Sequence, residues 1–154
     1  MLVRHWDWNV ILAGVPFGLT TASINIGKHI DKSGEDRVKK VTTLPVLLGQ
    51  TGSRILNISV IVIAYLVIAY LIAVPRFFTP IMAIVLIAAP DAWKAISRLS
   101  KPRPEAAPAG YPVWPRWFST VSFMHNRKFG NLFVLGVLLD TILRVIPATS
   151  GFWR

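Results

Sequence analysis

Three acidic residues and several cations gather in one short stretch of this sequence, between two apolar segments of membrane-spanning length. The stretch from Asn25 to Lys40 contains the acids Asp31, Glu35 and Asp36 together with five Lys or Arg residues. Carboxylate oxygens are suitable ligands for a hard divalent cation, and neighbouring Lys and Arg can bind the anionic oxygens of a phosphate that the cation also contacts. The stretch therefore predicts a site for a metal and a phosphorylated ligand, and the alternative is a solvated charged loop.

The spacing of the acids restricts which of them can share a cation. If a helix continues beyond Gly27, Asp31 and Glu35 lie on one face at i and i+4. Asp31 and Asp36 are five positions apart, so they converge only if the chain bends, and Ser33-Gly34 is the predicted place for that bend. Magnesium usually takes only one or two protein carboxylates and completes its shell with water and substrate phosphate. Either Glu35 or Asp36 could therefore be the second metal ligand beside Asp31.

The composition indicates an integral membrane protein. Of the 154 residues, 53% are hydrophobic and only 16% are charged, and the mean hydropathy is +0.53, which is too apolar for an ordinary soluble domain of this size. We expect an all-α fold, a single membrane domain over residues 1–154 that forms a bundle of four transmembrane helices. Runs of about the length that crosses a bilayer cover residues 10–27, 55–74, 77–96 and 129–146, and they leave the connecting loops 28–54 and 97–128.

The distribution of positive charge predicts the orientation. Six Lys or Arg residues lie between the first and second runs, and seven lie from Lys94, near the end of the third run, to the start of the fourth. The other side has only Arg4, Arg76, Arg144 and Arg154. Because cytoplasmic loops carry an excess of Lys and Arg, both charged loops should face the cytoplasm and both termini should lie on the opposite side of the membrane. We expect this membrane to be the inner (cytoplasmic) membrane of the cell. Basic loops beside anionic lipid headgroups also explain the net charge of +10, so we expect no nucleic-acid partner.

Two other features of the sequence bear on the site. There is no cysteine, which excludes disulfides, thiolate metal sites and cysteine nucleophiles. The Pro-rich segment 101–112 predicts a loop, and the aromatic and basic residues that follow it, up to Lys128, predict a segment at the cytoplasmic interface that covers the acidic stretch.

An ionisable residue in the last apolar run needs a partner. Asp140 lies inside this run, where a carboxylate is costly unless it faces protein or water. Arg144 follows at i+4 on the same helical face, so a structural ion pair between the two is the natural prediction.

The order of residues in the acidic stretch resembles a known motif. Asn25, Lys28-His-Ile-Asp31, Asp36-Arg37 and then Thr43-Leu-Pro45-Val-Leu-Leu-Gly49 are similar to the second acidic motif of the UbiA-type membrane prenyltransferases. The three following apolar runs are similar to that family's last three helices. The resemblance covers nearly the whole chain, but only about the C-terminal half of the family's nine-helix fold.

The resemblance implies transfer of an isoprenoid from its diphosphate to an acceptor, with magnesium as cofactor. By it, Asp31 and Asp36 would hold the magnesium, with Glu35 as the alternative second ligand because it restores the family's usual spacing of four. The residues that would bind the diphosphate are Asn25, Lys32, Arg37, Lys39 and Lys40. Electrostatic stabilisation of the departing diphosphate would supply most of the catalysis.

One part of the family's site has no counterpart in this sequence. The first acidic motif should precede the first apolar run, yet the only acid before Asp31 is Asp7. We therefore expect a half or truncated enzyme that is inactive alone, with membrane lipids, other membrane subunits and an isoprenoid diphosphate as partners. The main alternative is a non-catalytic structural subunit of a larger membrane complex, which could hold a lipid, quinone or pigment, and a transporter of charged substrates is the weakest of the three readings.

Overall fold

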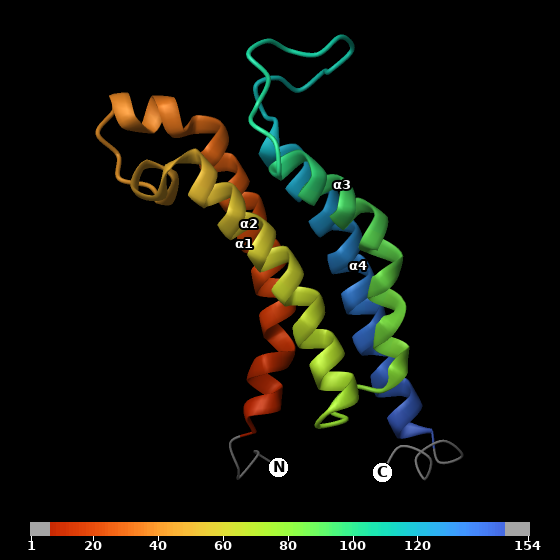
Figure 1. Cartoon of the computed structure of the whole chain (residues 1–154). Coiled ribbons are helices and arrows are strands. Elements are labelled where there is room, and N and C mark those ends of the chain that lie inside the picture. The colour runs from red at the N-terminus through yellow and green to blue at the C-terminus, as the bar shows by residue number, and fades with distance from the viewer. Residues whose placement is uncertain (1–6, 147–154) are drawn as a thin grey trace.

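The computed structural model describes residues 7–146, and the regular structure of this range is helical (Figure 1). Helix α1 spans Trp8–Val38 and α2 spans Leu44–Ala73. A 3₁₀ helix, η1 (Pro80–Ala88), continues directly into α3 (Ala89–Leu99), and α4 spans Phe118–Val145. The expectation of an all-α fold is confirmed for this part of the chain.

Helix α1 is longer than the first predicted span and has no bend at the predicted place. Asp7 caps its first turn by accepting a hydrogen bond from the backbone N–H of Asn9 at 2.8 Å, as short acidic side chains do at helix starts. The helix then runs through Ser33 and Gly34 without leaving helical geometry. The prediction of a bend there is wrong, because a single glycine between helix-forming neighbours costs only about 1 kcal/mol and does not by itself end a helix.

The segment 28–54, predicted as a loop, is mostly helical. Only residues 39–43 separate α1 from α2, and Lys40 takes a positive φ of 54° in this connection. Helix α2 begins with Pro45 in its first turn and is kinked at Gly49, whose φ of 72° is unfavourable for other residues. The kink turns the first part of α2 away from the direction of its apolar part.

The third apolar segment begins as a 3₁₀ helix because of its prolines. Pro80 occupies the first turn of η1, and Pro90 has no N–H to donate to the carbonyl of Leu86 four residues earlier. The N–H of Ala89 instead bonds that carbonyl in the tighter i to i−3 pattern. The segment stays helical from Pro80 to Leu99.

Three helical segments of the described chain are long and apolar enough to cross a membrane: Trp8–Val38, Leu44–Ala73 and Pro80–Leu99. They contain the first predicted span, all but the last residue of the second and most of the third. The fourth predicted span lies in α4, which is helical over 28 residues but carries Lys128, Asp140 and Arg144 in or beside its apolar run.

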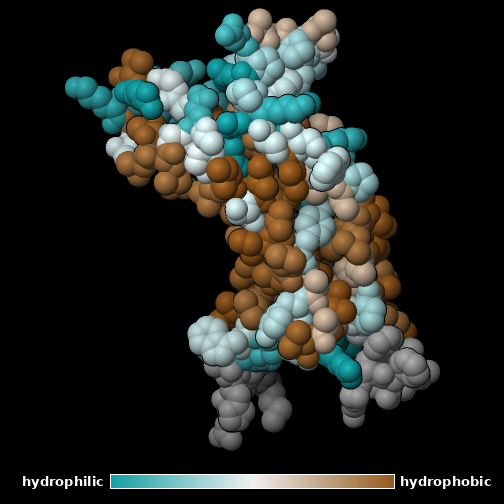
Figure 2. Space-filling view, viewed as in Figure 1, coloured by the Kyte–Doolittle hydropathy of each residue, from teal (hydrophilic) through white to brown (hydrophobic). Residues whose placement is uncertain are grey.

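The helices alternate in direction, so the charged connections gather at one end. The α1–α2 connection and the long segment between α3 and α4 lie together at the top in Figure 1, and the short α2–η1 turn lies at the opposite end. Residues 101–117 contain no helix, as the Pro-rich sequence predicts. Figure 2 shows an apolar belt around the middle of the visible face and polar side chains above it.

Close backbone contact joins α1 to the start of α4. A Cβ atom added at Gly27 would lie only 3.0 Å from the backbone N and Cα atoms of Ser119. Buried Ile26 and Ile30 flank this contact and pack with Phe118 and Val121 in one hydrophobic cluster. The absence of a side chain at Gly27 therefore places the acidic end of α1 against the N-terminus of α4.

Candidate functional site

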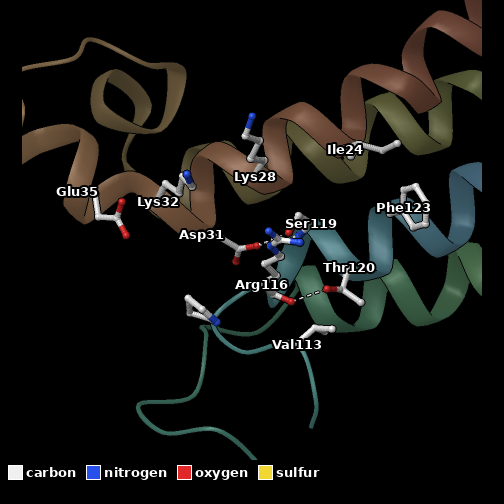
Figure 3. Close-up of a pocket in the computed structure, with 11 residues that line it drawn as sticks. Ile24, Lys28, Asp31, Lys32, Glu35, Val113, Arg116, Ser119, Thr120 and Phe123 are labelled. Carbon is white, nitrogen blue, oxygen red and sulfur yellow. Dashed lines mark hydrogen bonds between the residues drawn. The ribbon is translucent and has the colours of Figure 1, made fainter.

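A cavity of about 720 Å³ lies at the charged end of the bundle, between α1 and residues 113–123. One face of α1 lines it, together with the last residues of the long loop and the first turns of α4 (Figure 3). Its apolar wall consists of Ile24, Val113, Pro115 and Phe123. The cavity thus joins an apolar surface to charged side chains.

The α1 side of the cavity is a single helical face. Lys28, Asp31, Lys32 and Glu35 line it at the spacing i, i+3, i+4 and i+7, which brings side chains onto the same side of a helix. Because α1 does not end at Gly27, this spacing is preserved through the predicted loop. Of the two candidates for the second metal ligand, Glu35 therefore lines the same cavity as Asp31, and Asp36 does not.

The Asp31 carboxylate accepts three hydrogen bonds from the start of α4. Its Oδ1 accepts a hydrogen bond from the backbone N–H of Phe118 at 3.0 Å, and its Oδ2 accepts two from Ser119, from the backbone N–H at 2.9 Å and from the hydroxyl at 2.7 Å. Figure 3 shows the side chain reaching from α1 toward Ser119. The first N–H groups of a helix have no partners within it and carry positive partial charge, so Asp31 caps α4 from another helix.

Asp36 is engaged elsewhere and does not meet Asp31 in the cavity. Its Oδ2 lies 3.3 Å from Nδ1 of His29 and accepts a hydrogen bond from the Thr43 hydroxyl at 3.2 Å. Thr43 directly precedes α2, so Asp36 ties the end of α1 to the start of α2. The structure does not bring together the expected pair of Asp31 and Asp36.

Four charged side chains of the cavity have no partner within residues 7–146. Within the described chain, the side chains of Lys28, Lys32, Glu35 and Arg116 make no hydrogen bond or ion pair. Three of these are cations and one is a carboxylate. They are available to a ligand, whereas the carboxylate of Asp31 is largely occupied.

The acids do not form a metal cage on their own. In the range that the structure describes, no three His, Asp or Glu side chains converge as a metal site. Magnesium, however, needs only one or two protein carboxylates when a phosphate supplies further oxygens. The free carboxylate of Glu35 fits that requirement better than Asp31 or Asp36, whose oxygens already accept hydrogen bonds.

Of the five residues expected to bind diphosphate, only one lies in the cavity. Lys32 lines the cavity, whereas Asn25, Arg37, Lys39 and Lys40 are exposed and lie outside its lining. The cavity adds residues that the sequence analysis did not select: Lys28, Arg116, Ser119 and Thr120. Extending the helical spacing from Asp31 back by three residues would have found Lys28. The aromatic and basic pattern after the Pro-rich segment predicted that this part of the chain covers the acidic stretch, but it did not single out Arg116, Ser119 or Thr120.

A separate polar cluster lies at the other end of the bundle. Arg144 Nε donates to Asp140 Oδ2 at 2.8 Å, so the structure places these two residues together as the sequence predicted. Asp140 also accepts a hydrogen bond from the backbone N–H of Thr79 at 2.6 Å, and Arg144 Nη2 donates one to the Phe77 carbonyl at 2.6 Å. The pair therefore fastens the α2–η1 turn to α4.

Comparisons of this chain with protein-family models, with curated proteins and with solved structures give no match.

Proposed function

We propose that this chain is a prenyltransferase-like membrane protein whose cavity at the charged end of the bundle binds an isoprenoid diphosphate. The observation that supports this most is the combination of three uncommitted cations, Lys28, Lys32 and Arg116, with an apolar wall in one cavity. The cations suit the diphosphate oxygens, and the wall of Ile24, Val113 and Phe123 suits the hydrocarbon chain.

Magnesium bound with the diphosphate would neutralise part of its charge and make it a better leaving group. Glu35 would hold the metal beside the substrate oxygens, with Asp31 fixing the adjacent start of α4. Lys28, Lys32 and Arg116 would orient the diphosphate and stabilise its negative charge. We further propose that a second acidic cluster comes from another segment or chain and that this half does not catalyse by itself.

In this proposal the bundle spans the membrane four times, with α4 as the fourth span and the cavity facing the cytoplasm. The gathering of both basic connections at one end supports the orientation. Asp140 and Arg144 are compatible with a span because each is hydrogen-bonded to the other and to backbone groups.

The direct test is binding of farnesyl diphosphate to the purified full chain in nanodiscs, with and without magnesium. We expect magnesium-dependent binding that farnesol does not show. Lys28→Gln and Lys32→Gln should each weaken it about tenfold, the loss expected when one charge-assisted contact of about 1.4 kcal/mol is removed. Arg127→Gln, an exposed cation on α4 outside the cavity lining, is the matched control. Absence of farnesyl diphosphate binding at millimolar concentration would refute the proposal.

A second candidate, a non-catalytic subunit of a larger membrane complex, is favoured by the use of Asp31 as an interhelical cap. A site acid that accepts three protein hydrogen bonds serves the packing of the bundle whether or not a ligand binds. The exposed apolar side chains of α1, such as Val10, Ile11 and Phe17, could then contact neighbouring subunits.

Purification from native membranes in mild detergent, with mass spectrometry of the copurifying proteins, separates the two candidates. A stoichiometric partner that carries an Asn-Asp-rich membrane segment is expected for a divided prenyltransferase. A large assembly without such a partner is expected for a structural subunit.

A further inference from the structure

A second hollow, of about 530 Å³, is lined by the last turns of α3, residues 101–104 and Trp117. Lys94, Arg98 and Lys101 line it, and no acidic residue is among its lining residues. Lys94, Arg98 and Lys101 follow one another at i, i+4 and i+7, so they share one face of the end of α3 and of the residues just after it. Of the three, only Lys94 has an acidic partner in the described chain, Asp91 at 3.7 Å, so the group keeps a net positive charge that suits an anion.

Aromatic side chains fix the central cation of this hollow. The Arg98 guanidinium lies 4.2 Å from the centre of the Trp117 ring and 5.6 Å from that of Tyr111, and it donates to the Tyr111 hydroxyl at 3.5 Å. Such stacking holds a guanidinium in place while leaving its other N–H groups free to donate. Trp117, which also lines the hollow, has a buried indole N–H without a hydrogen-bond partner in the described chain.

The surroundings of the hollow indicate where its ligand comes from. Trp93 lines the hollow and is 71% exposed, as is typical of Trp at the boundary between headgroups and hydrocarbon. Leu86 and Ile87, which precede it in the same candidate membrane span, are more than half exposed. An anion in this hollow would therefore lie at one end of a helical segment that exposes apolar side chains.

We propose that this hollow binds the phosphate of an anionic glycerophospholipid whose acyl chains lie along η1. Arg98, Lys94 and Lys101 contact the phosphate oxygens, and Trp93 packs against the glycerol region. Basic pockets beside spans on the cytoplasmic side of a membrane are suited to such headgroups. The site is independent of the isoprenoid diphosphate cavity, because the two hollows share no lining residue.

The test is native mass spectrometry and lipid analysis of the full chain, released from nanodiscs that contain equal amounts of phosphatidylglycerol and phosphatidylcholine. About one phosphatidylglycerol per chain should be retained, in preference to phosphatidylcholine. Arg98→Gln and Lys101→Gln should each reduce its retention about tenfold, as for removal of one charge-assisted hydrogen bond. Lys101 is exposed, so its replacement should leave folding unchanged even if loss of the stacked Arg98 does not.

Arg127→Gln is again the control, since it removes one positive charge from the same end of the bundle outside the hollow. Equal losses in all three variants would mean diffuse attraction to the bilayer and would overturn the proposal, as would equal retention of the two lipids. Displacement of phosphatidylglycerol by millimolar inorganic phosphate would show that the hollow takes a soluble anion, which also contradicts a lipid site.

Discussion

Ser119 donates two hydrogen bonds to one oxygen of Asp31, from its backbone N–H at 2.9 Å and from its hydroxyl at 2.7 Å, across a separation of 88 residues. The residue that would be a metal ligand by the resemblance to the prenyltransferase motif is therefore also the cap of a distant helix. Both roles require a negative charge at the same place, because the N-terminus of α4 and a bound cation are both positive. The two roles make different predictions for the same substitution.

Replacement of Asp31 should destabilise the fold. Asp31→Ala removes the acceptor for three donors at the start of α4, and we expect a loss of about 2–3 kcal/mol in the free energy of unfolding. Unfolding in detergent or bicelles, followed by circular dichroism, measures this. Glu35→Gln is the control, since the Glu35 side chain is exposed and makes no hydrogen bond or ion pair with another described residue. Equal stability of the two variants would argue against the capping role.

The contact at Gly27 should be sensitive to a single methyl group. In Gly27→Ala the new Cβ would meet backbone atoms of Ser119 at 3.0 Å, which cannot move without displacing α4, so we expect destabilisation by about 1–3 kcal/mol. Gly34→Ala, in the same helix with no atom within 4 Å of the new Cβ, should be neutral or slightly stabilising because alanine favours the helix. A neutral Gly27→Ala would mean that α1 and α4 pack less closely than described.

The Asp140–Arg144 pair should contribute more to the free energy of unfolding than the Asp91–Lys128 pair. Asp140 is 6% exposed, and Asp140→Leu would leave Nε of Arg144 and the Thr79 N–H without their acceptor, for an expected loss of about 3 kcal/mol. Asp91→Leu breaks pairs with Lys94 and Lys128 at 3.7 and 3.0 Å, whose amino groups can be solvated, and should cost about 1 kcal/mol or less. Comparing the unfolding free energies of the two variants tests this order.

The orientation can be tested with single cysteines, because the chain has none of its own. Lys40→Cys and Ala107→Cys lie in the two connections at the charged end, and Arg76→Cys lies in the turn at the opposite end. An impermeant maleimide should label the first two from the cytoplasmic face of membrane vesicles and the third from the outer face. Labelling of Arg76→Cys and Lys40→Cys from the same face would contradict a bundle that spans the membrane between them.

The features that the sequence determined by itself are those that depend on residues close together along the chain. The apolar runs predicted an all-helical protein of the membrane class, and the three candidate spans agree with this. The prolines of segment 101–112 predicted a loop. The spacing of Asp140 and Arg144 placed them on one face of a helix, where they do meet. Each of these predictions depends on local backbone geometry, which a periodic pattern encodes directly.

Only the tertiary structure decided which partners the acidic residues have. Asp31 bonds Phe118 and Ser119, Asp36 bonds Thr43, and the cavity wall includes Val113 and Arg116 from a distant loop. The continuity of α1 through Ser33 and Gly34 then put Glu35, not Asp36, beside Asp31 in the cavity. These contacts depend on how α4 docks against Gly27, which is a matter of packing between segments about 90 residues apart and leaves no periodic signal in either one.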